Sequence, residues 1–292
     1  MQALNKPSWL KVKLPTHSNF FYVSSLVEKN NLHTICQSAK CPNASECWSQ
    51  KTATFLILGD ICTRNCGFCA VKSGEPHSPV LDESKRVAES VAAMELQYAV
   101  ITSVTRDDLT DGGASIFVDT INAIREISPL TKIETLIPDF GGKTEALASV
   151  IAADPEVLNH NIEVPESLYS KINRPQENYR RSLQVLENAS RMGAITKSGL
   201  MLGLGESEDE IIQTFQDLIN SGCKLLTVGQ YLQPRRNNAL VEKYYPPADF
   251  ARFKAIASEM GFKAIESDPL VRSSYHAHQL YDTLRKDQML AS

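Results

Sequence analysis

Six of the seven cysteines in this 292-residue sequence lie in two triplets near the N-terminus. The downstream triplet is Cys62, Cys66 and Cys69, spaced by three and then two residues, with Phe68 before the last cysteine. A four-iron cluster normally takes four cysteine thiolates, so three on one short loop leave one iron without a protein ligand. An open coordination position is where a bound metal does chemistry. A zinc knuckle or unrelated buried thiols are the alternatives, although zinc sites usually pair their cysteines and use four ligands.

The upstream triplet is Cys36, Cys41 and Cys47, spaced by four and then five residues. Clustered cysteines in a reducing compartment are more often metal ligands than disulfide partners, and the odd cysteine count also argues against a pure disulfide framework. The seventh cysteine, Cys223, stands alone and is interpreted as a small buried hydrophobic residue. The sequence therefore offers two separate thiol sites.

Composition narrows the class of protein. Charge is nearly balanced, with 30 Lys and Arg against 34 Asp and Glu, so there is no basic footprint for nucleic acid. No apolar run is long enough to span a bilayer. The first residues lack the apolar core of a signal peptide and the Arg-rich pattern of a transit peptide. We therefore expect a cytoplasmic protein without a membrane or nucleic-acid partner.

The elements that would position these cysteines alternate after residue 50. Short β-branched runs predict strands at Ala53–Gly59, Tyr98–Val104, Lys132–Ile137, Val157–Asn161, Lys197–Leu202, Leu225–Gln230 and Phe262–Ser267. Longer stretches predict helices at Asn19–Asn30, Leu81–Leu96, Ala114–Ile127, Lys143–Ala152, Glu177–Met192, Glu208–Asn220 and Pro247–Met260. Ser207 and Glu210 form a capping box, and a left-handed residue is expected at Gly193 and at Gly261. The alternation predicts an α/β fold with a parallel sheet, namely a partial (β/α)6 barrel that is TIM-like.

Three segments are predicted along the chain. Residues 1–50 form an N-terminal extension that carries the upstream triplet, residues 51–261 form the barrel, and residues 262–292 form a C-terminal extension. We expect both extensions to cover the barrel mouth. The Cys62–Cys69 loop directly follows the first predicted barrel strand, which puts it at the C-terminal mouth, where α/β barrels keep their active sites.

The downstream triplet with its aromatic residue resembles the signature of radical S-adenosylmethionine (AdoMet) enzymes. This resemblance implies that Cys62, Cys66 and Cys69 bind a [4Fe–4S] cluster whose fourth iron chelates AdoMet. It also implies that the backbone of Phe68 lies beside the adenine. In this superfamily one electron cleaves AdoMet to methionine and a 5′-deoxyadenosyl radical.

Longer stretches resemble the lipoyl synthase family. They include Ser-Ala-Lys-Cys-Pro-Asn-Ala-Ser-Glu-Cys-Trp, Asn-His-Asn-Ile-Glu, Gly-Gln-Tyr-Leu-Gln-Pro and Val-Arg-Ser-Ser-Tyr-His-Ala, and the resemblance covers nearly all of residues 7–278. It implies a sulfurtransferase that inserts two sulfur atoms, at C6 and C8 of an octanoyl chain amide-linked to a lysine of a carrier domain. A carbon radical can abstract hydrogen from such unactivated C–H bonds, so the cofactor carries the hard chemistry and the protein positions it.

The same resemblance implies that Cys36, Cys41 and Cys47 hold an auxiliary [4Fe–4S] cluster, which is consumed as the sulfur source. It implies that Ser273 is the fourth ligand of this cluster, with Ser274 as the alternative. An alkoxide is a harder donor than a thiolate and a poorer match for cluster iron, so the bond would be readily released. From the residues alone, a turn or capping role for both serines stays open.

Other strand ends carry the residues that would hold AdoMet. Thr105 and residues 106–108 end the second barrel strand, where the superfamily binds the AdoMet amino group. Asn161 and Glu163 follow a later strand and could bind the ribose hydroxyls. An ordinary strand-end or capping role stays open for each of them. The sequence does not decide the roles of His160, Arg174 and Arg272.

The family resemblance also implies partners. These are octanoylated lipoyl carrier domains (E2 subunits of 2-oxoacid dehydrogenases and the glycine cleavage H protein) and a low-potential electron donor such as ferredoxin or flavodoxin. Gln37-Ser38 and the run 235–238 depart from the family pattern and leave the carrier preference open.

Two other functions remain as alternatives. A radical AdoMet enzyme resembling biotin synthase would lack the upstream triplet and the Arg-Ser-Ser-Tyr motif, both of which are present. A non-catalytic zinc-binding or scaffold protein would not need both triplets.

Overall fold

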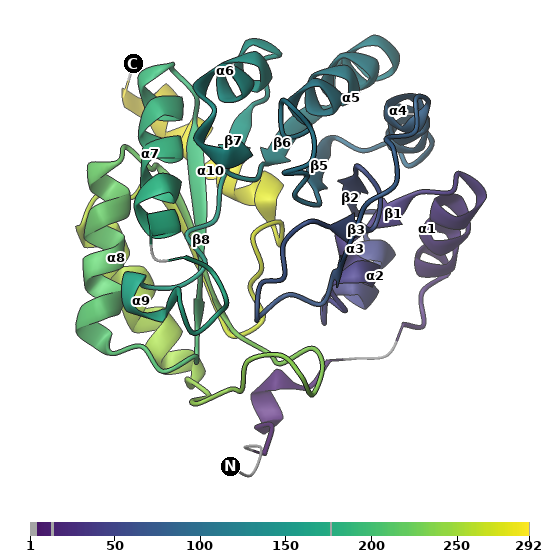
Figure 1. Cartoon of the computed structure of the whole chain (residues 1–292). Coiled ribbons are helices and arrows are strands. Elements are labelled where there is room, and N and C mark those ends of the chain that lie inside the picture. The colour runs from purple at the N-terminus through teal and green to yellow at the C-terminus, as the bar shows by residue number, and fades with distance from the viewer. Residues whose placement is uncertain (1–4, 13–14, 176, 292) are drawn as a thin grey trace. The chain divides into compact units, whose positions relative to one another are not determined.

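Strands and helices alternate along most of the chain, as the sequence pattern predicts. The computed structural model in Figure 1 describes residues 5–12, 15–175 and 177–291. Six strand–helix pairs follow one another, namely β2 (Thr54–Ile57) and α4 (Glu83–Ala93), β5 (Tyr98–Ser103) and α5 (Ala114–Ile127), β6 (Lys132–Leu136) and α6 (Thr144–Ala152), β7 (Val157–Asn159) and α7 (Glu177–Arg191), β8 (Thr196–Leu202) and α8 (Glu208–Asn220), and β9 (Leu225–Gln230) and α9 (Pro247–Glu259). A last strand, β10 (Ala264–Ser267), precedes helix α10 (Ala277–Ala291).

The chain divides into two units by the contacts that its residues make. The N-terminal unit comprises Val12–Asn65 and Cys69–Leu158, and the C-terminal unit comprises Met1–Lys11, Cys66–Phe68 and Asn159–Ser292. The predicted boundaries at residues 50 and 261 separate consecutive segments of the chain, whereas the two units are defined by contacts. The predicted boundaries therefore stay a prediction. Residues 1–4, 13–14, 176 and 292 lie outside the described residues.

The sheet of the N-terminal unit has the strand order β1-β2-β5-β6-β7. The short strand β1 (His33–Thr34) is antiparallel to β2, whereas β2, β5 and β6 are parallel. Helices α4, α5 and α6 lie side by side along this sheet (Figure 1). The carboxyl ends of the parallel strands therefore share one edge of the sheet, and the loops that follow them meet there.

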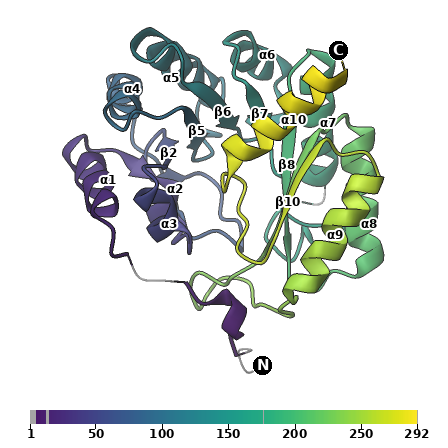
Figure 2. The same cartoon turned by 180° about the vertical axis from the view of Figure 1, so that it is seen from behind.

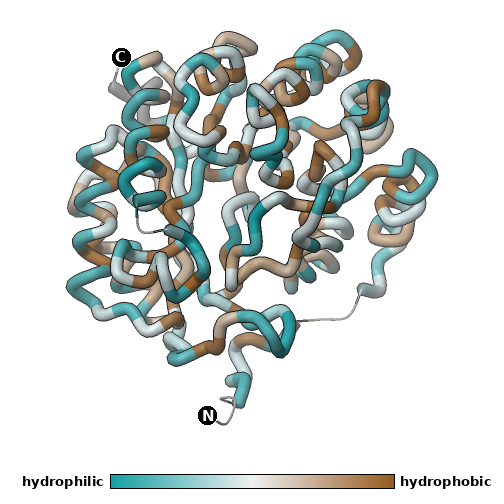
Figure 3. The backbone as a smooth tube through the Cα atoms, in the orientation of Figure 1, coloured by the Kyte–Doolittle hydropathy of each residue, from teal (hydrophilic) through white to brown (hydrophobic). Residues whose placement is uncertain are grey.

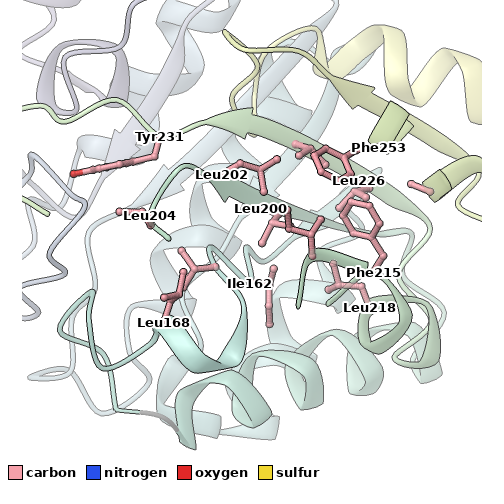
Figure 4. Close-up of a cluster of buried hydrophobic side chains, with 14 of the residues drawn as sticks. Ile162, Leu168, Leu200, Leu202, Leu204, Phe215, Leu218, Leu226, Tyr231 and Phe253 are labelled. Carbon is pink, nitrogen blue, oxygen red and sulfur yellow. The ribbon is translucent and has the colours of Figure 1, made fainter. Parts of the chain in front are cut away.

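The C-terminal unit is built on the parallel strands β8, β9 and β10. Helices α8 and α9 lie next to each other (Figure 2), and the rings of Phe215 and Phe253 meet between them with centroids 6.5 Å apart. The core side chains Leu200, Leu202 and Leu226 point from the strands into the same cluster (Figure 4). Burial of such apolar side chains is the main stabilising term for this unit.

Hydropathy explains why the strands and helices take these places. All four residues of β2 and all six of β9 are buried, as expected for parallel strands that are covered on both faces. The helices instead alternate hydrophobic and hydrophilic residues around their turns (Figure 3). An amphipathic helix buries one stripe against a sheet and leaves the other in water. No helix in the described part of the chain is long and apolar enough to cross a bilayer.

The predicted helix-end signals are confirmed. Ser207 Oγ accepts the Glu210 N–H at 3.3 Å, and Glu210 Oε2 accepts the Ser207 N–H at 2.7 Å, which completes the capping box of α8. Gly193 and Gly261 have φ angles of 92° and 107°. This left-handed conformation is the one that glycine adopts most readily after a helix.

Several short elements have no clear sequence signal. They are α2 (Ile35–Ser38), α3 (Ala44–Ser49), β3 (Ile61–Cys62), β4 (Lys72–Ser73) and the 3₁₀ turns Ser8–Leu10, Phe140–Gly142 and Glu166–Leu168, whereas α1 (Ser18–Lys29) was predicted, one residue later. Segments of two to six residues are too short to show a periodicity. The helix predicted at Leu81–Leu96 also proves shorter, because Glu95 has a φ of 56° that ends the helical backbone.

Candidate functional site

The upstream cysteines lie on two short helices of the N-terminal unit. Cys36 belongs to α2, Cys47 belongs to α3, and Cys41 occupies the turn between these helices. Thr34 caps α2 by accepting the Gln37 N–H. The Cys41 N–H donates to the Cys36 carbonyl at 3.0 Å, directly after Lys40 with its φ of 52°. Local capping and one left-handed residue thus bring three thiols onto one compact segment.

The electrostatics of these thiols fit an iron–sulfur cluster. Burial, followed by the charge of Cys41, raises the pKa of Cys36 to about 11. Burial, followed by the charges of Cys36 and Cys41, also raises the pKa of Cys47. The three groups are therefore close enough to oppose one another's ionisation. A cysteine binds metal as the thiolate. Cationic iron would stabilise these thiolates and so offset both the cost of burial and this repulsion.

A buried donor supports the same interpretation. The indole Nε1–H of Trp48 is buried and has no hydrogen-bond partner within the described residues. It lies beside Cys36, where it opposes the larger effect of burial, which raises the pKa of that thiol. Buried donors are normally paired, and a cluster-bound thiolate is an acceptor for this one. Across the described part of the chain, no three His, Cys, Asp or Glu side chains converge on the position of a single metal ion.

The downstream cysteines lie on the loop after β2. Cys62 ends β3, and its Sγ accepts the N–H groups of Arg64 at 3.4 Å and of Thr105 at 3.3 Å. Cys69 Sγ accepts the Val71 N–H at 3.4 Å. Such N–H donors to ligand sulfur set the reduction potential of a cluster. Both thiols therefore already receive the donors that a cluster ligand uses.

The middle of the same loop belongs to the C-terminal unit. The Gly67 N–H donates to the Ile172 carbonyl at 2.7 Å, and the Gly67 carbonyl accepts the Ala239 N–H at 2.8 Å. A Cβ at Gly67 would stand 3.3 Å from the Ile172 backbone, so glycine allows this close approach. Phe68 packs against the hydrophobic core of this unit. The backbone just before Phe68 and the Phe68 side chain are thus both held by this unit.

Arg64, which no pattern in the sequence marks as functional, holds the Cys62–Cys69 loop in place. Its guanidinium donates to both carboxylate oxygens of Asp107, at 2.7 and 2.8 Å, and to Asp139 Oδ1 at 2.6 Å. These hydrogen bonds lower the pKa of the Asp107 carboxyl. One signal for this contact is present in the sequence: Asp107 and Asp139 follow the ends of the parallel strands β5 and β6, so they are expected at the same sheet edge.

Residues 105–108, which are predicted to lie where the AdoMet amino group binds, make contacts within the N-terminal unit. The Thr105 N–H is directed at Cys62 Sγ, and the Thr105 carbonyl accepts from Thr63. The Asp107 carboxylate is bound by Arg64, and the Asp108 carboxylate is bound by the buried Arg106 at 2.7 Å. Both carboxylates thus have arginine partners within the N-terminal unit.

In the C-terminal unit the structure brings Asn161 and Ser273 together. The Asn161 amide donates to Ser273 Oγ at 2.7 Å, and the Ser273 hydroxyl lies 3.0 Å from Asn161 Oδ1. The two residues are 112 positions apart in the chain. Gly199 makes room for them, since a Cβ there would stand 2.7 Å from Asn161 Oδ1 and 3.0 Å from Ser273 Oγ.

Glu163 occupies a strained position beside this pair. Its φ of 70° lies in the left-handed region, which non-glycine residues adopt mainly where the fold requires it. Burial raises the pKa of its carboxyl, against the opposing influence of Arg174 and of the Asn161 hydrogen bond. The guanidinium of Arg174 lies over the Tyr169 ring, and its buried Nε has no hydrogen-bond partner within the described residues. This donor suits an anionic group of a bound ligand.

His160, Arg272 and Cys223 make contacts within the C-terminal unit. His160 is buried, and its Nε2 lies 3.0 Å from Ser182 Oγ. Arg272 donates to the Val271 carbonyl at 2.6 Å. Cys223 is fully buried, and burial raises the pKa of its thiol to about 12, which agrees with its interpretation as a small hydrophobic residue.

Comparison with known families defines the class of protein. The family model of the Radical SAM superfamily matches residues 56–218, which is more than half of the chain. Two solved structures share the fold. SuiB of Streptococcus suis bound to S-adenosylmethionine has a TM-score of 0.56 at 13% identity, with 75% of this chain and 51% of that chain covered. Coproporphyrinogen III oxidase (HemN) from Escherichia coli, a radical SAM enzyme, has a TM-score of 0.52 at 13% identity, with 77% and 57% covered.

These likenesses confirm the predicted α/β fold of partial-barrel type. The chain spans about half of the SuiB chain. At such low identity, the likeness concerns the fold alone.

Curated relatives are much more similar. A lipoyl synthase of Rubrobacter xylanophilus is 50% identical over 283 residues, which cover 96% of this chain and 88% of the relative. A lipoyl synthase of Chlorobaculum parvum is 51% identical over 274 residues, which cover 93% and 94%. The chain belongs to the lipoyl synthase family of radical SAM enzymes. It is therefore a sulfurtransferase that uses AdoMet and iron–sulfur clusters, one of them auxiliary, and acts on lipoyl carrier proteins.

Proposed function

We propose that this chain converts a protein-bound octanoyl-lysine to lipoyl-lysine, by inserting sulfur at C6 and C8 with the two thiol triplets in separate roles. The observation that carries the proposal is that the triplets occupy different segments with different surroundings. Cys36 and Cys47 lie on the short helices α2 and α3, where burial and mutual repulsion raise their pKa, whereas Cys62 lies after β2, where its sulfur accepts the N–H groups of Arg64 and Thr105. Two separate thiol triplets suit two separate clusters, each with its own role.

In this proposal Cys62, Cys66 and Cys69 hold the cluster that binds AdoMet. When bound, the clusters supply the electron that cleaves AdoMet to a 5′-deoxyadenosyl radical and the sulfur that is transferred. The protein binds and orients the reactants. The Phe68 backbone, fixed through Gly67, would line the adenine, and Thr105 would face AdoMet next to Cys62. Asn161 and Glu163 would bind the ribose, supported by their shared hydrogen bond.

Cys36, Cys41 and Cys47 hold the auxiliary cluster in this proposal, and Ser273 is its fourth ligand. The Ser273 hydroxyl has a defined partner in Asn161, which fixes the side chain at one position rather than leaving it to rotate. An oxygen ligand is a weaker match to iron in such a cluster than sulfur. Ser273 is therefore suited to a ligand position that opens during turnover.

The carriers proposed are octanoylated E2 subunits of 2-oxoacid dehydrogenases and the glycine cleavage H protein. The electron donor proposed is a low-potential protein such as ferredoxin or flavodoxin. The family membership supports lipoyl carriers in general. The particular carrier and donor need direct assays with each purified candidate.

The decisive experiment is anaerobic turnover of an octanoyl-lysine peptide. The reconstituted protein is incubated with the peptide, AdoMet and dithionite, and the products are read by mass spectrometry. We expect mono- and dithiolated peptide together with 5′-deoxyadenosine. The matched control replaces Cys223, a cysteine outside both triplets, with Ala, and this variant should behave as the wild type. AdoMet cleavage without any thiolated peptide would refute the proposed function.

A further inference from the structure

The segment Thr63–Arg64, between the first two cysteines of the downstream triplet, is bound to two strand ends of the N-terminal unit. The Thr63 N–H donates to the Thr105 carbonyl at 3.0 Å, and Thr63 Oγ1 accepts the Asp107 N–H at 3.1 Å. The Arg64 guanidinium donates hydrogen bonds to both carboxylate oxygens of Asp107 and to Asp139. A two-residue segment with this many partners has little freedom to move on its own.

The carboxylates of Asp107 and Asp139 differ in burial, and this difference shows which of them holds Arg64 more firmly. The side chain of Asp107 is 44% exposed, whereas that of Asp139 is 0% exposed and that of Arg64 is 20% exposed. An exposed ion pair contributes little to stability, because water and salt screen it. A buried carboxylate depends strongly on its cation, since loss of the partner leaves an uncompensated charge. Asp139 is therefore the partner that holds the Arg64 side chain in place.

The same segment controls the donors around Cys62. The Cys62 sulfur accepts one N–H from Arg64 itself and one from Thr105, whose carbonyl accepts a hydrogen bond from Thr63. A displacement of Arg64 would thus move both N–H groups relative to the sulfur. These bonds stabilise the reduced, more negative cluster, so their loss lowers the reduction potential.

We propose that Arg64, held by Asp139, is a positioning residue that keeps two N–H donors on Cys62 and so sets the reduction potential of the AdoMet-cleaving cluster. The inference rests on the proposed ligand role of Cys62. It assigns to Arg64 a geometric function rather than a purely electrostatic one. Arginine is suited to it, because its planar fork fixes direction as well as charge, which lysine cannot do.

The experiment isolates one cluster in the full-length chain. Cys36, Cys41 and Cys47 are replaced by Ser, so that only the downstream triplet remains, and the midpoint potential is measured by titration monitored with electron paramagnetic resonance. The variants in this background are Arg64→Lys and Asp139→Ala. Lys72→Gln serves as the matched control, because it removes a positive charge from the same loop, where Lys72 pairs with Asp60 at 2.8 Å.

The two variants separate position from charge by the sign of the effect. Arg64→Lys keeps the charge, so an electrostatic role predicts no change, whereas the positioning role predicts a lower potential. Asp139→Ala removes a negative charge, so electrostatics alone predicts a higher potential, whereas the positioning role predicts a lower one. We expect both potentials to fall, and by more than in Lys72→Gln.

Three results would overturn the inference. An unchanged potential in Arg64→Lys, with the protein folded, would reduce Arg64 to a structural ion pair. A higher potential in Asp139→Ala would show that its charge alone acts on the cluster; if that variant fails to fold, the Arg64→Lys measurement decides. Absence of any cluster signal in the cysteine background would instead show that the downstream triplet is not a cluster site, which would remove the proposed function and this inference together.

Discussion

A methyl group at residue 199 tests the contact between Asn161 and Ser273. Gly199 lies in the buried strand β8, and a Cβ there would stand 2.7 Å from Asn161 Oδ1 and 3.0 Å from Thr227 Oγ1. It would also stand 3.0 Å from Ser273 Oγ. Since ordinary van der Waals contact begins near 3.4 Å, the amide oxygen must retreat by about 0.7 Å. Such a shift breaks the paired hydrogen bonds.

The expected magnitude follows from two effects. Forcing a methyl group into a packed site costs about 1–3 kcal/mol. Each hydrogen bond lost adds about 0.5–1.5 kcal/mol. With both hydrogen bonds lost, we expect Gly199→Ala to lower the free energy of unfolding by about 2–6 kcal/mol, measured by urea denaturation of the reduced apoprotein. In the reconstituted enzyme it should also lower the yield of lipoyl product per 5′-deoxyadenosine formed, because Ser273 is displaced.

Gly193→Ala is the matched control in the same unit. Gly193 has a φ of 92°, and no atom lies within 4 Å of its ideal Cβ. The substitution therefore adds only backbone strain, about 1–2 kcal/mol, and should leave the product ratio unchanged. If Gly199→Ala is no less stable than Gly193→Ala and gives the wild-type product ratio, the reasoning about the Asn161–Ser273 contact is refuted.

Four further predictions follow from the proposed function. Reconstituted protein should hold about 8 iron atoms per chain, and replacing the Cys62–Cys69 triplet should halve the iron and abolish AdoMet cleavage; residual cleavage would contradict the assignment. Replacing the Cys36–Cys47 triplet should spare AdoMet cleavage but eliminate sulfur insertion, and a thiolated product from this variant would exclude the auxiliary cluster as donor. An octanoyl-lysine peptide should be turned over and free octanoate should not, so equal turnover of both would count against a tethered substrate. Ser273→Ala should keep 5′-deoxyadenosine formation and impair the lipoyl product, while Ser273→Cys should keep the cluster and slow sulfur release; wild-type yield from both would return Ser273 to a structural role.

Local features of the sequence predicted most of the fold. The strand at Leu225–Gln230 and the helices at Ala114–Ile127 and Glu208–Asn220 have the predicted bounds, because burial and periodicity are properties of short windows. The capping box at Ser207 is local for the same reason, since it joins residues three positions apart. The thiol spacings also lie within short segments, so both cysteine triplets could be predicted as cluster sites without the structure.

The contacts that position this chemistry could not be read from any local window. Arg64 meets Asp139 across 75 positions, and Asn161 meets Ser273 across 112. The sequence marked Asn161 and Ser273 as separate candidates but gave no sign that they touch, and it did not mark Arg64 or Asp139 at all. Parallel strands place residues from distant segments at one sheet edge, so the pairing depends on strand order and register. The sequence by itself determined which groups can hold clusters, while tertiary packing decided which side chains hold those groups in place.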